Sequence, residues 1–140
     1  MQAQKLPISI IVLTFNEEAN IAPCLDTIVD WAGEVFIVDS GSTDRTLNII
    51  SQYGTQVVHH LFENYSRQRN WAQASLPLTH QWVFHIDADE RVSPQLISEL
   101  RQHFATAPMG GDTAGFLVRR QIQFLGRSIT HGGIYPTYHC

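Results

Sequence analysis

Short apolar runs alternate with longer amphipathic stretches along this chain of 140 residues. The first run, Ile8–Leu13, is nearly continuous and rich in β-branched residues, which is typical of a strand covered on both faces of a parallel sheet. Shorter runs predict further strands at Val35–Val38, Thr55–Val58, Trp82–Ile86 and Gly115–Arg120. Four helices are predicted from helical spacing and capping residues: Ile21 to Gly33, Asp44 to Gly54, Tyr65–Ala74 and Ser93 to about Phe104.

Strands that alternate with helices imply βαβ units. The fold class predicted is therefore α/β, with a Rossmann-like, mainly parallel sheet flanked by helices. The length suits one domain over residues 1–140. In sheets of this kind ligands bind beyond the carboxyl ends of the strands, so the site is expected there.

Composition narrows the class of partner. The net charge is −4, which argues against a nucleic-acid groove because such a groove needs a basic surface. No apolar run approaches the roughly 20 residues of a membrane span, so no transmembrane segment is predicted. Two cysteines, Cys24 and Cys140, do not make a disulfide framework, and Cys24 is interpreted as a small buried hydrophobe. A reduced, cytoplasmic compartment fits better.

Polar residues follow three of the predicted strands where each strand ends. Thr14, Asn16 and Glu17 follow the first, Asp39 follows the second, and Asp87-Ala88-Asp89-Glu90 follows the fourth. Because the carboxyl ends of parallel strands meet at one edge of a sheet, these residues should line the same edge. Three carboxylate-bearing strand ends together predict a ligand site.

The pair Asp87 and Asp89 predicts a metal site. The two are expected in extended or nearly extended backbone, which would point both side chains the same way. Carboxylate oxygens suit Mg²⁺ or Mn²⁺, with water and substrate phosphates as the other ligands. One alternative is a solvated acidic turn that caps the helix beginning near Ser93. Another is a phosphohydrolase with Asp87 as nucleophile, although no partner lysine is evident.

The segment Asp39–Asp44 joins a predicted strand to a predicted helix. Gly41 permits a tight turn, and Ser42, Thr43 and Asp44 are expected to cap the helix. It matches neither a P-loop nor a dinucleotide fingerprint. Since Asp39 is not needed for capping in this interpretation, it is assigned to a ligand.

Three motifs occur in order along the chain: Ile11–Glu18, Val38–Asp44 and Asp87–Arg91. Together they resemble the motifs of glycosyltransferase family 2. Three more narrow the resemblance to the branch containing lipopolysaccharide-core β-1,4-glucosyltransferases: Gln68-Arg69-Asn70, Phe124-Leu125-Gly126 and His131-Gly132-Gly133. The resemblance covers nearly the whole chain and implies the GT-A nucleotide-sugar-binding fold.

The resemblance also implies roles for individual residues in a pocket for a nucleotide diphosphate sugar, typically a UDP-sugar. Thr14 and Glu17 would line the base and ribose, Asp39 would accept a hydrogen bond from the base, and Arg69 would face the nucleotide. A further two residues are expected at the sugar and diphosphate. They are Asp87, which would contact the ribose or donor sugar, and Asp89, which would ligate the Mn²⁺ or Mg²⁺.

By the same resemblance, the activity expected is metal-dependent, inverting sugar transfer to a glycan or lipid-linked glycan acceptor of the cell envelope, as in lipopolysaccharide biosynthesis. The catalytic base is expected beyond Cys140, so we expect a C-terminally truncated chain that lacks the acceptor half and is inactive alone. The alternative is a non-catalytic nucleotide-sugar-binding module. The location expected is cytoplasmic, with peripheral attachment to the inner face of the cytoplasmic membrane left open.

Overall fold

The computed structural model describes residues 3–107, 112–128 and 137–139. The chain divides into two compact units, residues 1–105 and 106–140. No helix in the described part of the chain is long and apolar enough to cross a membrane.

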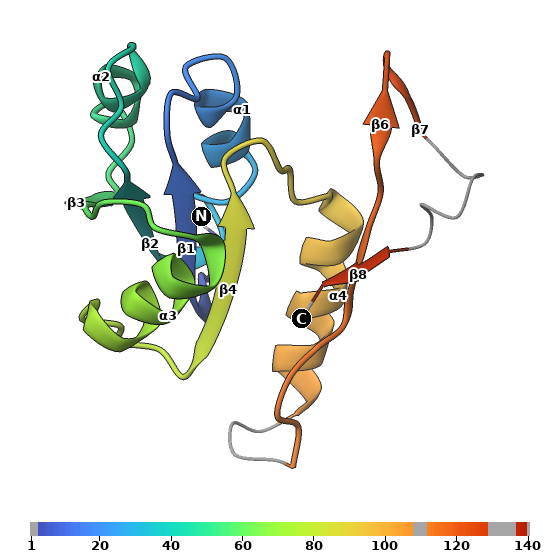
Figure 1. Cartoon of the computed structure of the whole chain (residues 1–140). Coiled ribbons are helices and arrows are strands. Elements are labelled where there is room, and N and C mark those ends of the chain that lie inside the picture. The colour runs from blue at the N-terminus through green and yellow to red at the C-terminus, as the bar shows by residue number, and fades with distance from the viewer. Residues whose placement is uncertain (1–2, 108–111, 129–136, 140) are drawn as a thin grey trace. The chain divides into compact units, whose positions relative to one another are not determined.

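A four-stranded parallel sheet is the centre of the first unit (Figure 1). β1 (Leu6–Thr14) lies between β2 (Ala32–Asp39) and β4 (Trp82–Asp87), and β3 (Gln56–His59) pairs with the other side of β2. The predicted parallel sheet is therefore confirmed. The chain runs from β1 outward to β3 and then returns to β4 on the opposite side of β1, so the strand order reverses at β1.

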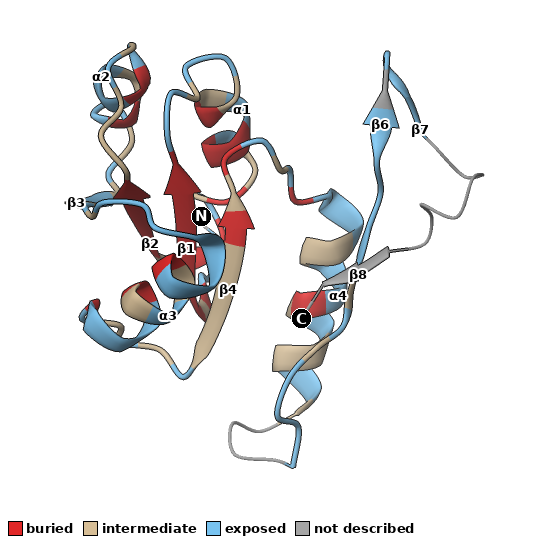
Figure 2. Cartoon of the chain, in the orientation of Figure 1, coloured by how far each residue is buried: buried red, intermediate tan, exposed pale blue. Residues whose placement is uncertain are grey.

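Helices cover both faces of this sheet: α1 (Ile21–Asp26), α2 (Thr46–Ile50), α3 (Tyr65–Ser75) and α4 (Pro94–Thr106). Figure 2 shows that β1 is buried along its length, as its continuous apolar run predicted. Ile10 and Val12 share a hydrophobic cluster with residues of α1, α2 and α4. Ile11 and Leu13 share a second cluster with Ala72 of α3. Alternate residues of one strand thus face opposite helical layers.

The first helix is shorter than predicted, and the role predicted for Gly33 was wrong. α1 ends at Asp26, and Gly33 is a residue of β2 rather than a helix stop. A Cβ atom at this position would lie 2.7 Å from the carbonyl oxygen of Leu6. The absence of a side chain therefore permits the close approach of β1.

The second helix is also shorter, and its capping differs from the prediction. α2 begins at Thr46, and its N-cap residue, Arg45, makes no side-chain capping bond. Asp44 Oδ1 accepts a hydrogen bond from the Thr46 amide at 2.9 Å. Ser42 and Thr43 are used in contacts between loops, so the capping prediction holds only for Asp44.

The second unit contains two short antiparallel pairs: β5 (Val118–Arg120) with β8 (Thr137–His139), and β6 (Gln123–Phe124) with β7 (Arg127–Ser128). Leu125 and Gly126 join β6 to β7, both at positive φ, which is the backbone of a two-residue hairpin turn. The predicted strand Gly115–Arg120 is confirmed only over its C-terminal half. The motif His131-Gly132-Gly133 and the residue Cys140 lie outside the described residues.

Candidate nucleotide-sugar site

The sheet register brings the predicted polar strand ends together. Thr14 pairs with Asp39 across β1 and β2, and Leu13 pairs with Asp87 across β1 and β4. Thr14, Asp39 and Asp87 therefore end three neighbouring strands at one edge of the sheet. This edge includes the point where the strand order reverses, which is where open α/β sheets bind ligands.

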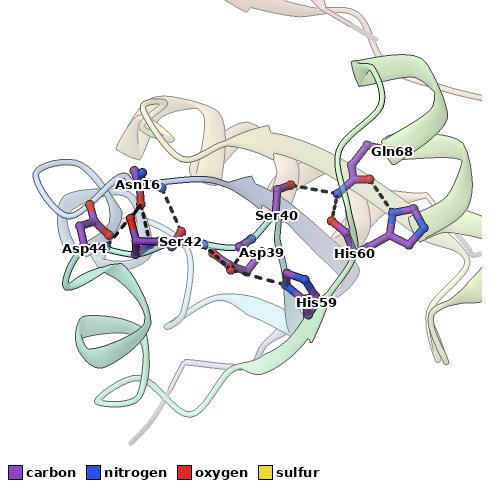
Figure 3. Close-up of polar contacts among 10 residues, drawn as sticks. Asn16, Asp39, Ser40, Ser42, Asp44, His59, His60 and Gln68 are labelled. Carbon is purple, nitrogen blue, oxygen red and sulfur yellow. Dashed lines mark hydrogen bonds and ion pairs between the residues drawn. The ribbon is translucent and has the colours of Figure 1, made fainter.

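Asp39 closes the turn that follows β2 (Figure 3). Its side chain is 2% exposed, and Oδ2 accepts hydrogen bonds from the amides of Gly41 and Ser42, both at 2.9 Å. The Ser42 hydroxyl donates to Oδ1 at 2.5 Å. Gly41 has a φ of 100°, a conformation that favours glycine. Asp39 therefore holds the turn that precedes α2 and does not cap the helix itself, and its assignment to a ligand stays a prediction.

Asn16 joins the loop after β1 to the loop after β2 (Figure 3). Its amide donates to Ser42 Oγ at 2.9 Å, and its Oδ1 accepts from the amides of Thr43 at 2.8 Å and Asp44 at 3.4 Å. The φ of Asn16 is 50°, a left-handed conformation that asparagine tolerates better than most residues. The Asn16 amide and the Ser42 hydroxyl thus form a short chain of hydrogen bonds that ends on Asp39.

The two glutamates after Asn16 tighten the same junction. The Glu17 amide donates to Thr46 Oγ1 at 2.8 Å, and the Glu17 side chain accepts from Asn20 Nδ2 at 2.9 Å. The Glu18 amide donates to Asp44 Oδ2 at 3.2 Å. Desolvation raises the pKa of Asp44, but the hydrogen bonds from Thr46 and Glu18 outweigh it and hold the pKa below its ordinary value of 3.8.

A buried amide on α3 ties this helix to the site. Gln68 is 1% exposed, and its Nε2 donates to Ser40 Oγ at 3.2 Å and to the His60 carbonyl at 3.1 Å. Its Oε1 lies 2.7 Å from His60 Nδ1, and the His60 ring stacks on Trp71 at 3.8 Å. Sequence reasoning noted Gln68 only as part of a motif. Its polar side chain on the sheet-facing side of a helix was the available signal.

Asp87 and Arg69, which were predicted separately, meet in the structure. Arg69 Nη2 donates to Asp87 Oδ1 at 3.0 Å, with side-chain exposures of 28% and 27%. Arg69 Nε is buried and has no hydrogen-bond partner in the described part of the chain. The Thr14 hydroxyl is likewise buried without a partner there. Each is a polar group that a ligand at this edge could satisfy.

The Asp87–Glu90 segment is a turn, so the extended backbone predicted for Asp87 and Asp89 was wrong. β4 ends at Asp87, the Glu90 amide donates to the Asp87 carbonyl at 2.9 Å, and Glu90 Oε2 accepts from the Asp87 amide at 2.8 Å. Asp89 is exposed, and its carboxylate has no hydrogen bond or ion pair with the described residues. The turn does not cap α4, because Ser93 Oγ accepts from the Leu96 amide at 3.2 Å.

Cys24 lies behind this turn as the buried hydrophobe that the sequence predicted. It is 0% exposed, and its Sγ lies 3.9 Å from the Asp87 carbonyl oxygen. Burial raises the pKa of its thiol to about 12, with the turn's three carboxylates adding to the effect and Arg91 opposing it. Cys24 therefore supports the turn as a buried, neutral thiol.

The fit of a metal ion depends on what the turn can supply. Among the described residues, no group of three or more His, Cys, Asp or Glu side chains is arranged to hold a metal ion. Mg²⁺ is commonly held by one or two carboxylates, with phosphates and water as further ligands. Asp89, with Asp87 beside it, fits a cation that is shared with a diphosphate and does not fit an all-protein cage.

Two further residues end or follow strands at this edge and were not assigned to the site from the sequence. Phe15 directly follows the buried Thr14 and is 55% exposed. His59 lies at the end of β3, and its Nδ1 is 3.8 Å from Asp39 Oδ2 (Figure 3). The signals available in the sequence were an aromatic residue immediately after the first strand and a histidine at a strand end.

Comparisons with curated proteins give relatives that are named glycosyltransferases. The chain is 32% identical over 133 residues to the lipopolysaccharide core biosynthesis glycosyltransferase LpsC of Rhizobium meliloti, a match that covers 90% of this chain and 46% of the relative. It is 35% identical over 99 residues to the uncharacterized glycosyltransferase RT0209 of Rickettsia typhi, covering 71% of this chain and 33% of the relative. The chain thus spans about a third to a half of the length of these relatives.

Solved structures with a similar fold are glycosyltransferases of the GT-A class. S. aureus TarS 1-349 has a TM-score of 0.54 and 26% identity, over 70% of this chain and 32% of that one. Glucosyl-3-phosphoglycerate synthase from Mycobacterium tuberculosis, in complex with Mn²⁺, UDP and phosphoglyceric acid, has a TM-score of 0.51 and 26% identity, over 60% and 34%. The family model described as glycosyl transferase family 2 matches residues 9–132, and the chain therefore belongs to this family.

Proposed function

We propose that this chain provides the donor-binding part of a glycosyltransferase that uses a UDP-linked sugar together with Mn²⁺ or Mg²⁺. The observation that carries the proposal is the convergence of Thr14, Asp39 and Asp87 at one sheet edge. Asp89 lies in the adjoining turn and has no partner among the described residues. Family membership and the likeness to a synthase solved with Mn²⁺ and UDP support it.

The nucleoside is assigned to the β1–β2 side of the edge. Among the described residues, Asp39 Oδ1 accepts a hydrogen bond only from the Ser42 hydroxyl. A carboxylate oxygen can accept a second donor, such as the imino N–H of uracil. The buried Thr14 hydroxyl lies on the neighbouring strand and lacks a partner in the described part of the chain. Glu17 is held by Thr46 and Asn20 and would line the ribose.

The diphosphate and the donor sugar are assigned to the β4 side. Arg69 keeps a buried, unpartnered Nε while its Nη2 holds Asp87, so it has a donor left for a phosphate oxygen. Because Asp87 is already paired, Asp89 is the better cation ligand of the two. A divalent cation held there would neutralise the charge that develops on a departing diphosphate.

The acceptor is proposed to be a glycan or lipid-linked glycan, on the basis of the likeness to the lipopolysaccharide core enzyme. We propose a single displacement that inverts the anomeric centre, as the resemblance implies. The base is assigned to a residue outside the Asp87–Glu90 turn, as the resemblance implies. That base would act within hydrogen-bond reach of the acceptor hydroxyl.

A phosphohydrolase with Asp87 as nucleophile is less well supported. The single lysine of the chain, Lys5, precedes β1 and donates to the Val29 carbonyl at 3.1 Å, at the opposite end of the strands from Asp87. The Asp87 carboxylate is also held in an ion pair by Arg69. Turnover of an aryl phosphate by the chain would revive this alternative.

The proposal is tested by thermal denaturation with a panel of nucleoside diphosphates, in Mn²⁺ or in chelator. UDP in Mn²⁺ should give the largest stabilisation, about 2.7 kcal/mol at a hundred times its dissociation constant. Asp89→Asn should remove the metal-dependent part. Asp30→Asn, an exposed aspartate just before β2 at the opposite end of the strands, should change nothing. Equal stabilisation by UDP in chelator and in Mn²⁺ would contradict the proposal.

A further inference from the structure

Arg91 follows the acidic turn and binds it from outside. Its Nη1 donates to the carbonyl oxygens of Ala88 at 3.3 Å and Glu90 at 3.0 Å. Inside the turn, the Asp87 amide donates to Glu90 Oε2 at 2.8 Å. The guanidinium thus fixes the backbone on both sides of Asp89, the residue with no partner of its own in the described part of the chain.

The same guanidinium reaches the loop after β1. Arg91 Nη2 donates to Asn20 Oδ1 at 3.2 Å, and Asn20 Nδ2 donates in turn to Glu17 Oε2 at 2.9 Å. The Asn20 amide is therefore used at both ends, as an acceptor toward one loop and a donor toward the other. Glu17 is itself anchored, because its backbone amide donates to Thr46 Oγ1 at 2.8 Å.

Resting on the proposed function, we propose that Arg91 and Asn20 are positioning residues that couple nucleotide binding to metal binding through the protein. The bridge Glu17–Asn20–Arg91 joins the loop assigned to the ribose with the turn assigned to the cation. A nucleotide that orders Glu17 would, through this bridge, order the backbone around Asp89. Metal bound at Asp89 would favour the nucleotide-binding arrangement of Glu17 by the same amount, because coupling between two sites is reciprocal.

The chemistry of the bridge explains why these residue types are needed. Arginine presents several donors in a fixed planar fork, so one side chain can hold two carbonyls and an amide oxygen at once. A lysine ammonium lacks this geometry. The positive charge is also held against the turn that carries Asp87, Asp89 and Glu90, because Nη1 binds two carbonyl oxygens of that turn. It therefore keeps the acidic turn compact before a cation binds.

The test measures the affinity of the full chain for UDP by calorimetry, in Mn²⁺ and in chelator. The readout is the ratio of the two dissociation constants. Arg91→Ala and Asn20→Ala should each reduce this ratio about fivefold, at the lower end of typical coupling factors. In both variants UDP affinity in chelator should fall less than UDP affinity in Mn²⁺. The double variant should lose little more than either single variant, since both changes break one bridge.

Arg101→Ala is the matched control, because Arg101 lies on α4 and donates to the Gln4 carbonyl, away from the acidic turn. It should leave the ratio unchanged. If Arg91→Ala unfolds the chain, Asn20→Ala, which keeps the arginine, decides the question. A wild-type chain with no metal dependence overturns the proposed function and this inference with it. An unchanged ratio in folded Asn20→Ala or Arg91→Ala, or an equal loss of UDP affinity with and without metal, overturns this inference alone.

Discussion

The loop after β2 and the turn after β4 both follow strands of the central sheet and both carry carboxylates, yet they hold them in different ways. Asp39 is buried and accepts three hydrogen bonds from its own turn. Asp89 is exposed and has no partner among the described residues. The first loop is organised before any ligand arrives, whereas the second keeps a carboxylate available for a cation.

Asp87 lies between these two extremes. It is about a quarter exposed and is held by Arg69, which keeps one donor unused. A site for a nucleotide diphosphate needs an ordered loop for the base, such as the loop after β2, beside a more open acidic turn. The base is selected by fixed hydrogen bonds. The cation shared with the phosphates needs an exposed oxygen ligand. The contrast gives the following predictions, in order of decreasing effect.

The largest effect is expected from Asp39→Ala. The change leaves two half-buried amides and a hydroxyl without their acceptor, so the free energy of unfolding should fall by about 3 kcal/mol. Asp89→Ala, the matched change at the open turn, should alter it by no more than about 0.5 kcal/mol. Urea denaturation with an unchanged slope checks both values. Equal losses of unfolding free energy in the two variants would remove the distinction between the loop after β2 and the turn after β4.

A smaller loss is expected from Gln68→Leu, which keeps the approximate size of the side chain. Its amide satisfies Ser40 and His60 in a site with almost no exposure to solvent, so the loss should be about 2 kcal/mol. Asn70→Leu, on an exposed position of the same helix, is the control and should change stability little. Similar urea midpoints for the two variants would show that Gln68 does not hold α3 to the loop after β2.

The smallest effect is expected at Asn16, where two variants distinguish the contribution of the side chain from that of the backbone conformation. Asn16→Gly removes the acceptor for Thr43 and Asp44 but keeps the positive φ, so it should cost about 1 kcal/mol. Asn16→Ala should cost about 1 kcal/mol more, because alanine is strained in the left-handed region. The difference between the two chemical denaturation curves is the measured quantity. If alanine were no worse than glycine, the loop would not require this conformation.

The sequence was sufficient to predict the sheet, because strand periodicity and the alternation of strands and helices follow from local patterns. The edge that carries Thr14, Asp39 and Asp87 followed from the rule that parallel strands end together. Within the loops the predictions were weaker. The direction that Asp39 faces, toward a ligand or toward its own turn, depends on the amides of Gly41 and Ser42. An aspartate shortly before a glycine is a known turn signal, so the sequence did contain an indication of the second arrangement.

The other errors have related physical causes. Asp87 and Asp89 were expected in extended backbone, but Glu90 folds back onto the Asp87 amide and makes a turn. Gly33 was interpreted as a helix stop, because the sequence does not reveal that the Leu6 carbonyl passes close to it. The bridge depends on a hydrogen bond between Arg91 and Asn20, which are 71 positions apart in the sequence. Such distant pairs leave no periodic signal.

The central claim is that nucleotide and cation meet at this sheet edge, with Asp89 as the protein ligand of the cation. Paramagnetic broadening by Mn²⁺ in an amide NMR spectrum tests it most directly. UDP alone should shift the amides of Gly41 and Ser42. Mn²⁺ added with UDP should broaden the amides of Asp87–Glu90 most strongly, and Asp89→Asn should abolish this broadening. Broadening centred elsewhere, for example at His59 and His60, or left intact in Asp89→Asn, would contradict the account.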